Sequence, residues 1–307
     1  MAGQFFERIS QYVESEISVT AMAVQKGEEQ MVLCSADLVG IDEWVLQLAR
    51  EELAKICPEV APQNLMVAAT HTHTSLKIAN NAPQSRYGRN TVSVLQEFLP
   101  ADKMYKPMVT TDASVITPEE SAFFAAQRIA NEIISVFEEI TDLQCDGEFS
   151  HKVLNVELPL RQATMAEYDL AVRELEHYVE KNKDKASFDY ADNAKMYIYA
   201  GTIMRYRLQQ KTQVYPMESH VIRLGNIAFA TNPFELFLDY GNQIKARSYA
   251  EQTFIVQLCN GIGGYLPTEN AEKAGHYSAY ISSGNVGHEG GDLLVRWTLS
   301  EIQKLWE

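Results

Sequence analysis

The stretch MVLCSADLVGIDEWVLQLAREELAKICPEVAPQNLMVAAT, residues 31–70, decides the expected fold. It opens on an apolar run, Met31 to Leu38, that is typical of a strand. From Ile41 onward the apolar residues recur at helical spacing until Pro58 stops the pattern. A second short apolar run, Asn64 to Thr70, indicates a buried strand. Strand, helix and strand in this order predict an α/β protein whose ligand site lies beyond the carboxyl ends of its strands.

The remaining sequence continues this alternation, and we expect a single α/β domain over residues 1–307 with a mixed sheet flanked by helices. Ile17 to Val24 is expected to pair with the strand at Met31. Residues 76–117 lack periodicity and predict a long irregular excursion that could act as a lid. Further strands are expected in FSHKVLNVELPL, VIRLGNIAFAT and TFIVQLCNG, and further helices in Pro118 to Ile140, Thr164 to Lys183, Asp189 to Gln210, NPFELFLDYGNQIKARS and DLLVRWTLSEIQKLW.

Charge and composition narrow the class of partner. The chain has 307 residues, 46% of them hydrophobic, which is enough for a sizeable core. Its 41 acidic residues against 26 basic ones give a formal charge of −15, which disfavours nucleic acid and anionic membrane surfaces as partners. Charged residues interrupt the first 19 positions, so we expect neither a signal peptide nor a transmembrane segment, and we expect a cytoplasmic protein.

The four cysteines are scattered without the CxxC spacing of a zinc site. Cys34 and Cys259 lie in apolar runs, where a reduced thiol in the core is the expectation. Neither Cys57 nor Cys145 changes this interpretation. The sequence therefore predicts neither a disulfide nor a zinc site built from cysteine.

The strand at Asn64 ends in ATHTHTS, which places two histidines one residue apart. Alternate residues of a strand face the same way, so His71 and His73 would project together beyond the strand end. Neutral imidazole is a common zinc ligand, and such a pair is a plausible ligand geometry. The alternative is that both rings cap the strand end by hydrogen bonding. His220, inside the strand MESHVIRL, is expected to be a structural histidine.

The segment ATNPFELF places an acidic residue where a strand gives way to a helix. Asn232 as N-cap, Pro233 as the first helical residue and Glu235 at the third position would form a capping box. A helix start at the carboxyl end of a strand is also where a sheet protein places its site, so Glu235 could instead be a metal ligand. Spacing alone favours the cap.

Residues 261–291 form a glycine-rich segment after a buried strand. It matches neither GxGxxG nor GxxxxGK[ST], so it is not a phosphate loop. Its aromatic and imidazole side chains fit a loop that closes over a substrate, although a surface loop with one packed tyrosine fits equally. Those side chains are Tyr265, His276, Tyr277 and His288.

In this order the motifs CSADLVGI, ATHTHTS, IRLGNIAFATNPFELF and CNGIGGYLPTENAEKAGHY resemble the neutral/alkaline non-lysosomal ceramidase family. The resemblance covers most of the chain outside its middle. It implies a ceramidase-catalytic-domain-like fold and a zinc-dependent amidase that cleaves its substrate with metal-activated water. The family holds zinc with the first histidine of THTH, a histidine from a middle segment, the glutamate after the strand and the tyrosine of the GYxPT loop.

Carried over to this chain, the resemblance implies His71, Glu235 and Tyr265 as ligands of one Zn²⁺ per chain. His73 would lie beside the metal and position substrate or water, and Tyr265 would also stabilise the oxyanion. The implied substrate is a small N-acyl or lipid-like molecule, and a soluble amide fits at least as well as ceramide. The sequence does not indicate an oligomeric state.

The chain departs from the family pattern in its middle. The segment that should supply the second ligand histidine is missing, as though two family segments were joined within Gln127 to Glu132, and no histidine lies between His73 and His151. His276 or His288 could substitute for the lost ligand. This departure leaves a second hypothesis open, a catalytically inactive remnant that acts as a binding or scaffold protein.

A third hypothesis is a metal-dependent hydrolase on a (β/α)₈ barrel that begins with an HxH strand. It would need further histidines at later strand ends, and His220 is the sole candidate. The HxHxDH signature of another metallohydrolase class fails, because Thr74, Ser75 and Leu76 follow His73.

Overall fold

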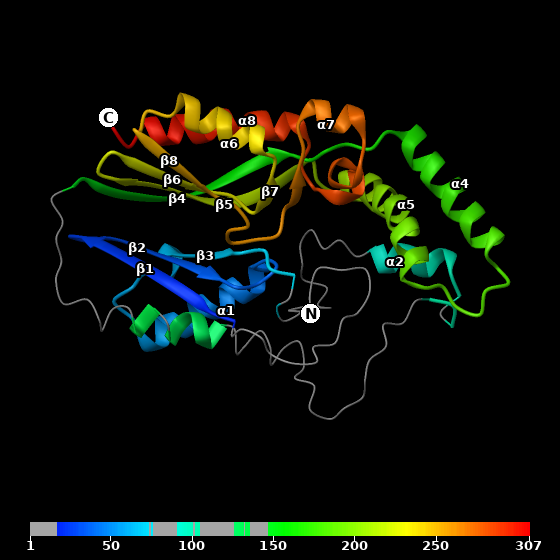
Figure 1. Ribbon diagram of the computed structural model, residues 1–307, viewed down its shortest axis with the longest axis horizontal. Helices are drawn as coiled ribbons and strands as arrows, with labels where there is room; N and C mark the ends of the chain where they lie inside the picture. The colour runs from blue at the N-terminus through cyan, green and yellow to red at the C-terminus, as the bar shows by residue number, and fades with distance from the viewer. Residues whose placement is uncertain are drawn as a thin grey trace.

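The computed structural model of the protein describes residues 17–73, 75, 91–100, 102–104, 126–131, 133–135 and 147–307. Two mixed sheets lie one above the other, with helices on the outer face of each (Figure 1). The α/β class with mixed sheets flanked by helices is therefore confirmed. The described strands are divided between separate sheets and do not form one continuous sheet.

The first sheet has the strand order β1-β2-β3. β1 and β2 are antiparallel, as predicted, and β2 and β3 run parallel through the crossover helix α1. Asp42 caps α1 by accepting a hydrogen bond from the backbone N–H of Trp44. The bounds are β1 Val19–Lys26, β2 Glu29–Ala36, α1 Glu43–Ile56 and β3 Leu65–Ala69.

Helix α1 buries one face against this sheet. Leu53 and Ala49 are fully buried, and they pack with Ile129 and Ile133 from the helical residues 126–131 and 133–135. Each such aliphatic side chain contributes roughly 1.5–3 kcal/mol by leaving water. Helix α1 and the helical residues 126–131 and 133–135 lie below the first sheet in Figure 1.

The second sheet has the order β4-β5-β6-β8, with an antiparallel β4–β5–β6 meander and a parallel β6–β8 pair. Gly225 turns the chain between β5 and β6 at φ 59°, a conformation that glycine adopts without strain. Helices α6 and α8 cover the outer face of the sheet (Figure 1). The bounds are β4 Phe149–Pro159, β5 Val214–Leu224, β6 Ile227–Thr231, β8 Gln252–Val256, α6 Leu238–Arg247 and α8 His288–Gln303.

The inner faces of the two sheets meet in a small apolar cluster that includes Met66, Ile222 and the thiol of Cys259. The three described cysteines, Cys34, Cys57 and Cys259, are buried and free, as expected for core thiols. Cys145 lies outside the described residues.

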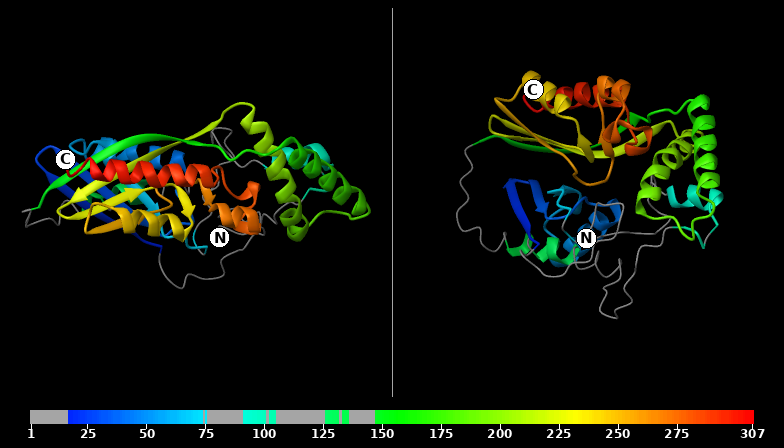
Figure 2. Two further views of the ribbon diagram at one scale, coloured as in Figure 1. Left: turned by 90° about the horizontal axis from the view of Figure 1, so that it is seen from above. Right: turned by 45° about the vertical axis from the view of Figure 1, so that its right-hand side comes forward.

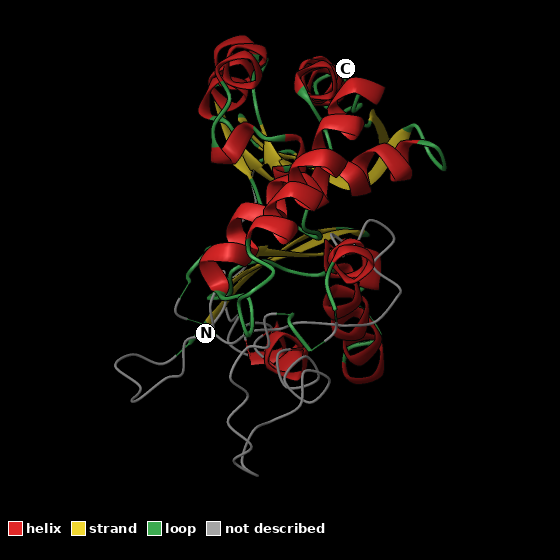
Figure 3. Cartoon of the chain, turned by 90° about the vertical axis from the view of Figure 1, so that its right-hand side faces the viewer, coloured by secondary structure: helices red, strands yellow, loops and turns green. Residues whose placement is uncertain are grey.

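A cluster of helices stands at one end of the sheets (Figure 2), and Figure 3 views the molecule from that end. Thr164 and Asp189 cap its two long helices with complete capping boxes, and both helices lie where the sequence predicts them. The cluster consists of α2 Thr91–Phe98, α4 Met165–Lys181 and α5 Tyr190–Gln209.

Three predictions about local structure are wrong. Residues 91–98 form α2 inside the segment expected to be irregular; the other residues of that segment, and most of the expected helix from Pro118 to Ile140, lie outside the described residues. Residues 234–236 form a strand where a helix start is expected. The glycine-rich segment is largely regular, with β9 Gly264–Leu266, α7 Glu269–Ala274 and two short 3₁₀ turns, and α8 already begins at His288. Across the described residues, no helix combines the length and apolarity that a bilayer span requires.

Candidate functional site

His71 lies just past the end of β3, in a left-handed backbone conformation with φ 63°. This region is uncommon for residues other than glycine and costs roughly 1–2 kcal/mol. Strand alternation therefore does not orient the ring, because the strand ends at Ala69. The orientation comes from a hydrogen bond of 2.6 Å that Nδ1–H donates to the carbonyl oxygen of Val39, which lies between β2 and α1.

His73 stays close to His71 in spite of the left-handed turn. The two ring centroids are 4.9 Å apart, and the rings meet edge to face with an interplanar angle of 77°. The two imidazoles are thus brought together, as the sequence predicts, although by the turn and not by a shared strand face.

Glu235 is the middle residue of β7 Phe234–Leu236, a short strand that pairs in parallel with β9. The expected capping box is wrong, because the N–H of Asn232 donates to the carbonyl oxygen of Val256 at 2.9 Å and the Asn232 side chain accepts from the N–H of Phe234. Phe234 is fully buried against Tyr215, and this packing holds the segment extended.

Tyr265 is the register partner of Glu235 across the β7–β9 ladder. Burial, together with a hydrogen bond to the Glu235 carboxylate and its negative charge, raises the pKa of Tyr265 above its ordinary value. The phenol is therefore protonated and donates to the carboxylate. Tyr277, which is half exposed, contacts the Tyr265 ring edge to face at a centroid distance of 5.6 Å.

The three predicted ligands converge from two layers of the molecule. His71 follows a strand of the first sheet. Glu235 and Tyr265 lie on β7 and β9, whose residues Phe234 and Leu266 pack in the core of the second sheet. His71 Nε2 is 3.4 Å from Glu235 Oε2, and both side chains are about one quarter exposed, at 32% and 21%.

The spacing of His71 and Glu235 is chemically informative. The Val39 carbonyl can only accept, so Nδ1 carries the proton and Nε2 faces the carboxylate. A charge-assisted N–H to carboxylate bond is about 2.7–2.9 Å long, and the observed 3.4 Å exceeds it. Two ligands of a tetrahedral zinc, each at ~2.0–2.1 Å, lie about 3.3–3.4 Å apart. The pair thus fits two donors that share a cation.

The structure does not bring His276 or His288, the possible substitutes for the missing ligand histidine, to His71 and Glu235. The ring and backbone N–H of His288 both contact the carboxylate of Glu272, at 2.8 Å each, at the start of α8. His276 is exposed, with a backbone φ of 133°. Within the described part of the chain, no group of three His, Cys, Asp or Glu side chains could hold a metal, and among these residues the phenol of Tyr265 is the third donor that the sequence predicts.

Sequence reasoning missed the groups that hold these side chains in place. The N–H of Gly263 donates to the carbonyl of Pro233, which fixes the approach to β9, and a Cβ at Gly284 would lie 2.0 Å from the Tyr265 carbonyl oxygen. Arg205 is buried and donates to the carbonyl oxygens of Gly284 and Asn285. The glycine at position 284 is a local signal of close approach, but the sequence does not reveal what approaches it.

Comparisons with known proteins add a distant structural likeness. No protein-family model matches the chain, and no curated protein matches its sequence. Among solved structures, a ceramidase complexed with C2 is 11% identical with a TM-score of 0.45, over 88% of this chain and 66% of that chain. The neutral ceramidase of Pseudomonas aeruginosa is 12% identical with a TM-score of 0.43, over 90% of this chain and 67% of that one. The chain thus spans about two thirds of the length of each, and we argue function from its own side chains.

Proposed function

We propose that the protein is a zinc-dependent hydrolase that cleaves the amide bond of a small N-acyl or lipid-like compound. The observation that carries the proposal is the approach of His71 Nε2 to Glu235 Oε2 at 3.4 Å, with the Tyr265 phenol hydrogen-bonded to the same carboxylate. An imidazole, a carboxylate and a phenol are nitrogen and oxygen donors that zinc accepts. The amide substrate is supported by the order of the sequence motifs alone.

The residues around the site have separable roles in this proposal. The Val39 carbonyl fixes the tautomer of His71 and aims Nε2 inward, as outer partners of ligand histidines do. Glu235 supplies the negative charge. When bound, zinc would supply a Lewis acid that polarises the amide carbonyl and lowers the pKa of water from ~15.7 toward ~7.

The phenol and the second imidazole complete the site. Tyr265 stays protonated, and once its O–H is released from the Glu235 carboxylate it can donate a hydrogen bond to negative charge that develops on the substrate oxygen. In this proposal His73, whose ring meets that of His71 edge to face, orients the attacking water or the substrate.

The second candidate is an inactive binding or scaffold protein. The small number of strong metal donors favours this candidate. Among the described residues, the site offers His71, Glu235 and the protonated phenol of Tyr265, whereas catalytic zinc sites usually have three strong protein ligands. This candidate predicts weak or absent zinc and no turnover at any pH.

Metal analysis of the purified protein separates the two candidates. We expect about one zinc per chain, lost in His71→Ala and retained in His177→Ala, a matched change at an exposed position of α4. We also expect hydrolysis of short N-acyl amides that a chelator abolishes and added zinc restores. Activity that survives complete removal of zinc would overturn the mechanism, and about one zinc per chain that His71→Ala removes would rule out the second candidate in its simplest form.

A further inference from the structure

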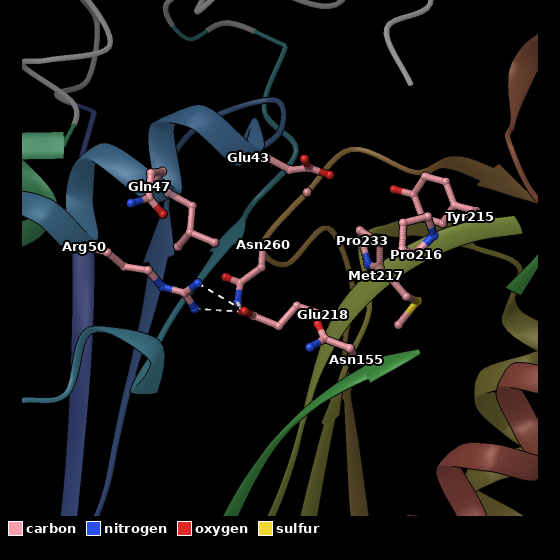
Figure 4. A pocket seen from close by; sticks show the side chains of 12 residues that line it. Glu43, Gln47, Arg50, Asn155, Tyr215, Pro216, Met217, Glu218, Pro233 and Asn260 are labelled. Atoms are coloured by element: carbon pink, nitrogen blue, oxygen red, sulfur yellow. Dashed lines mark hydrogen bonds and ion pairs between the residues drawn. The ribbon is translucent and has the colours of Figure 1, made fainter. Parts of the chain in front are cut away.

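A buried polar chain crosses from one sheet to the other beside a cavity of about 260 Å³. Arg50, Glu218 and Asn260 line this cavity and point toward one another (Figure 4). The lining includes none of the three candidate ligands His71, Glu235 and Tyr265.

Asn260 connects the two layers through both ends of its amide. Two hydrogen bonds attach it to β3 of the first sheet. Its backbone N–H donates to the carbonyl oxygen of Val67 at 3.0 Å, and its side-chain oxygen accepts from the N–H of Val67 at 2.8 Å. Its side-chain nitrogen donates across to Glu218 Oε1 at 2.8 Å and reaches His220 Nε2 at 3.0 Å, both in β5. The bond from Val67 fixes which end of the amide is oxygen.

A second link between the layers runs through two stacked imidazoles. His151 in β4 bonds the carbonyl oxygen of Gln30 in β2 through Nδ1, and its Nε2 lies 2.8 Å from Nδ1 of His220. His220 is fully buried, and its Nε2 lies 2.9 Å from Glu218 Oε1. The order is thus carbonyl, imidazole, imidazole, carboxylate.

If the 2.8 Å contact between His151 and His220 is kept as a hydrogen bond, counting protons along this chain leaves two protonation states. The Gln30 carbonyl only accepts, so His151 carries its proton on Nδ1. If both rings are neutral, His220 donates from Nδ1 to His151 and its bare Nε2 accepts from Asn260. In that state the 2.9 Å contact with Glu218 places two acceptors face to face. A third proton turns that contact into a hydrogen bond and removes the one from Asn260.

Charged side chains lie around the His151–His220 pair and influence its protonation. Glu29 accepts from the backbone N–H of His151, and Glu218 is held by both terminal nitrogens of Arg50 at 2.7 and 3.1 Å. The neighbouring thiol of Cys259 stays protonated, since burial raises its pKa to about 12.

Glu218 Oε1 is already crowded. It accepts from Arg50 and Asn260, and a protonated His220 would be its third donor. A carboxylate oxygen offers about two lone-pair directions, so the new donor would compete with Asn260.

We propose that the His151–His220 pair is a proton-operated latch between the two sheets. In the neutral pair, His220 Nε2 accepts a hydrogen bond from Asn260. When the pair takes one proton from solvent, Nε2–H donates to Glu218 instead, and the lost bond to Asn260 loosens the contact between β5 and the segment that follows β8. The latch needs no metal. Its consequence for catalysis rests on the proposed function, because Val67 lies on the strand that leads to His71 and Asn260 on the segment that leads to Tyr265.

The test is an NMR titration of the histidine ring nitrogens in the full-length, metal-free chain from about pH 8 to about pH 4. We expect His151 and His220 to titrate as one coupled pair that takes up a single proton, with His220 Nε2 bare at the start and protonated at the end. The readout is independent of zinc and of activity, so it can fail or succeed separately from the proposed function.

Two variants sharpen the titration. Asn260→Asp keeps a residue that tolerates φ 57° but replaces the donor by an acceptor, and it should raise the apparent pKa of the pair by about one unit or more. Glu218→Gln removes the charge that accepts the third proton and should lower it by a similar amount.

Exposed His177 provides the matched control, since His177→Gln should leave the pair unchanged. The proposal is overturned if the two rings titrate independently near the ordinary histidine value. It is equally overturned if His220 Nε2 is already protonated near pH 8, or if neither variant that folds moves the apparent pKa.

Discussion

Glu235 lies directly opposite Tyr265 in the parallel ladder of β7 and β9, and its carboxylate is hydrogen-bonded to the Tyr265 phenol. Backbone pairing therefore sets the relative position of two candidate zinc ligands. His71 reaches the same carboxylate from the other sheet. The geometry of the site thus depends both on a local ladder and on the stacking of the two sheets.

Removing the Tyr265 hydroxyl should weaken zinc binding with little effect on folding. We expect Tyr265→Phe to lower zinc affinity about tenfold or more, because a donor is lost and the aromatic ring that packs against Tyr277 remains. Competition with a chelator of known affinity measures this. Tyr249→Phe, at a 66% exposed tyrosine, is the control, and equal affinity in both variants would remove Tyr265 from the ligand set.

Adding one methyl group behind Tyr265 should disturb the site. In Gly284→Ala the new Cβ would lie 2.0 Å from the Tyr265 carbonyl oxygen, so β9 must move, and we expect a loss of about 1–3 kcal/mol in the free energy of unfolding together with weaker zinc binding. Gly241→Ala is the control. It lies in α6 with no atom within 4 Å of its Cβ, and alanine there should stabilise by about 0.5–1 kcal/mol. Denaturant unfolding compares the two, and similar effects would contradict the close contact.

Two arginines on α5 should differ sharply in importance. Arg205 is buried and donates three hydrogen bonds to Gly284 and Asn285, so Arg205→Met should cost about 2–4 kcal/mol by leaving their oxygens without donors. Arg207 pairs with Glu97 at the surface, where both side chains are about half exposed, and Arg207→Met should cost under about 1 kcal/mol. Equal losses in urea unfolding would show that burial of Arg205 is not what matters.

The stability of the fold should fall with acid through the buried histidine pair. Burial lowers the pKa of His151 to about 4 and also lowers that of His220, so the folded state favours neutral rings while the unfolded chain takes up protons near pH 6.5. The contribution is complete above about pH 6.5 and is lost as the pH falls toward 4, by about 2 kcal/mol.

The histidine contribution is isolated by comparison with His151→Gln. Carboxylates elsewhere also titrate in acid, but they are common to both proteins, so the difference between the two curves of unfolding free energy against pH reports the imidazole. We expect the wild type to lose its advantage between about pH 6.5 and pH 4. Parallel curves would mean that His151 is protonated equally in both states.

The elements that the sequence predicts correctly are those with a strong local signal. Helices α1, α4 and α5 are capped by Asp42, Thr164 and Asp189, whose side chains accept hydrogen bonds from backbone N–H groups two or three residues further on. The run at Leu65 is recognisable as a buried strand because every position is apolar. The motifs around His71, Glu235 and Tyr265 predict that these residues bind zinc, and this role remains a prediction.

The sequence by itself determined the α/β class and most of the described elements, because periodicity and capping act within a few residues of the chain. Its motifs also named the three candidate ligands His71, Glu235 and Tyr265. Tertiary structure alone decided that Glu235 lies in a strand, since its partner in β9 is remote and outweighs a local helix-start signal. It also decided that His71 turns through a left-handed conformation onto the Val39 carbonyl, and that His151 meets His220 between the sheets. These contacts join segments far apart in sequence, and their geometry is fixed by how the two sheets stack.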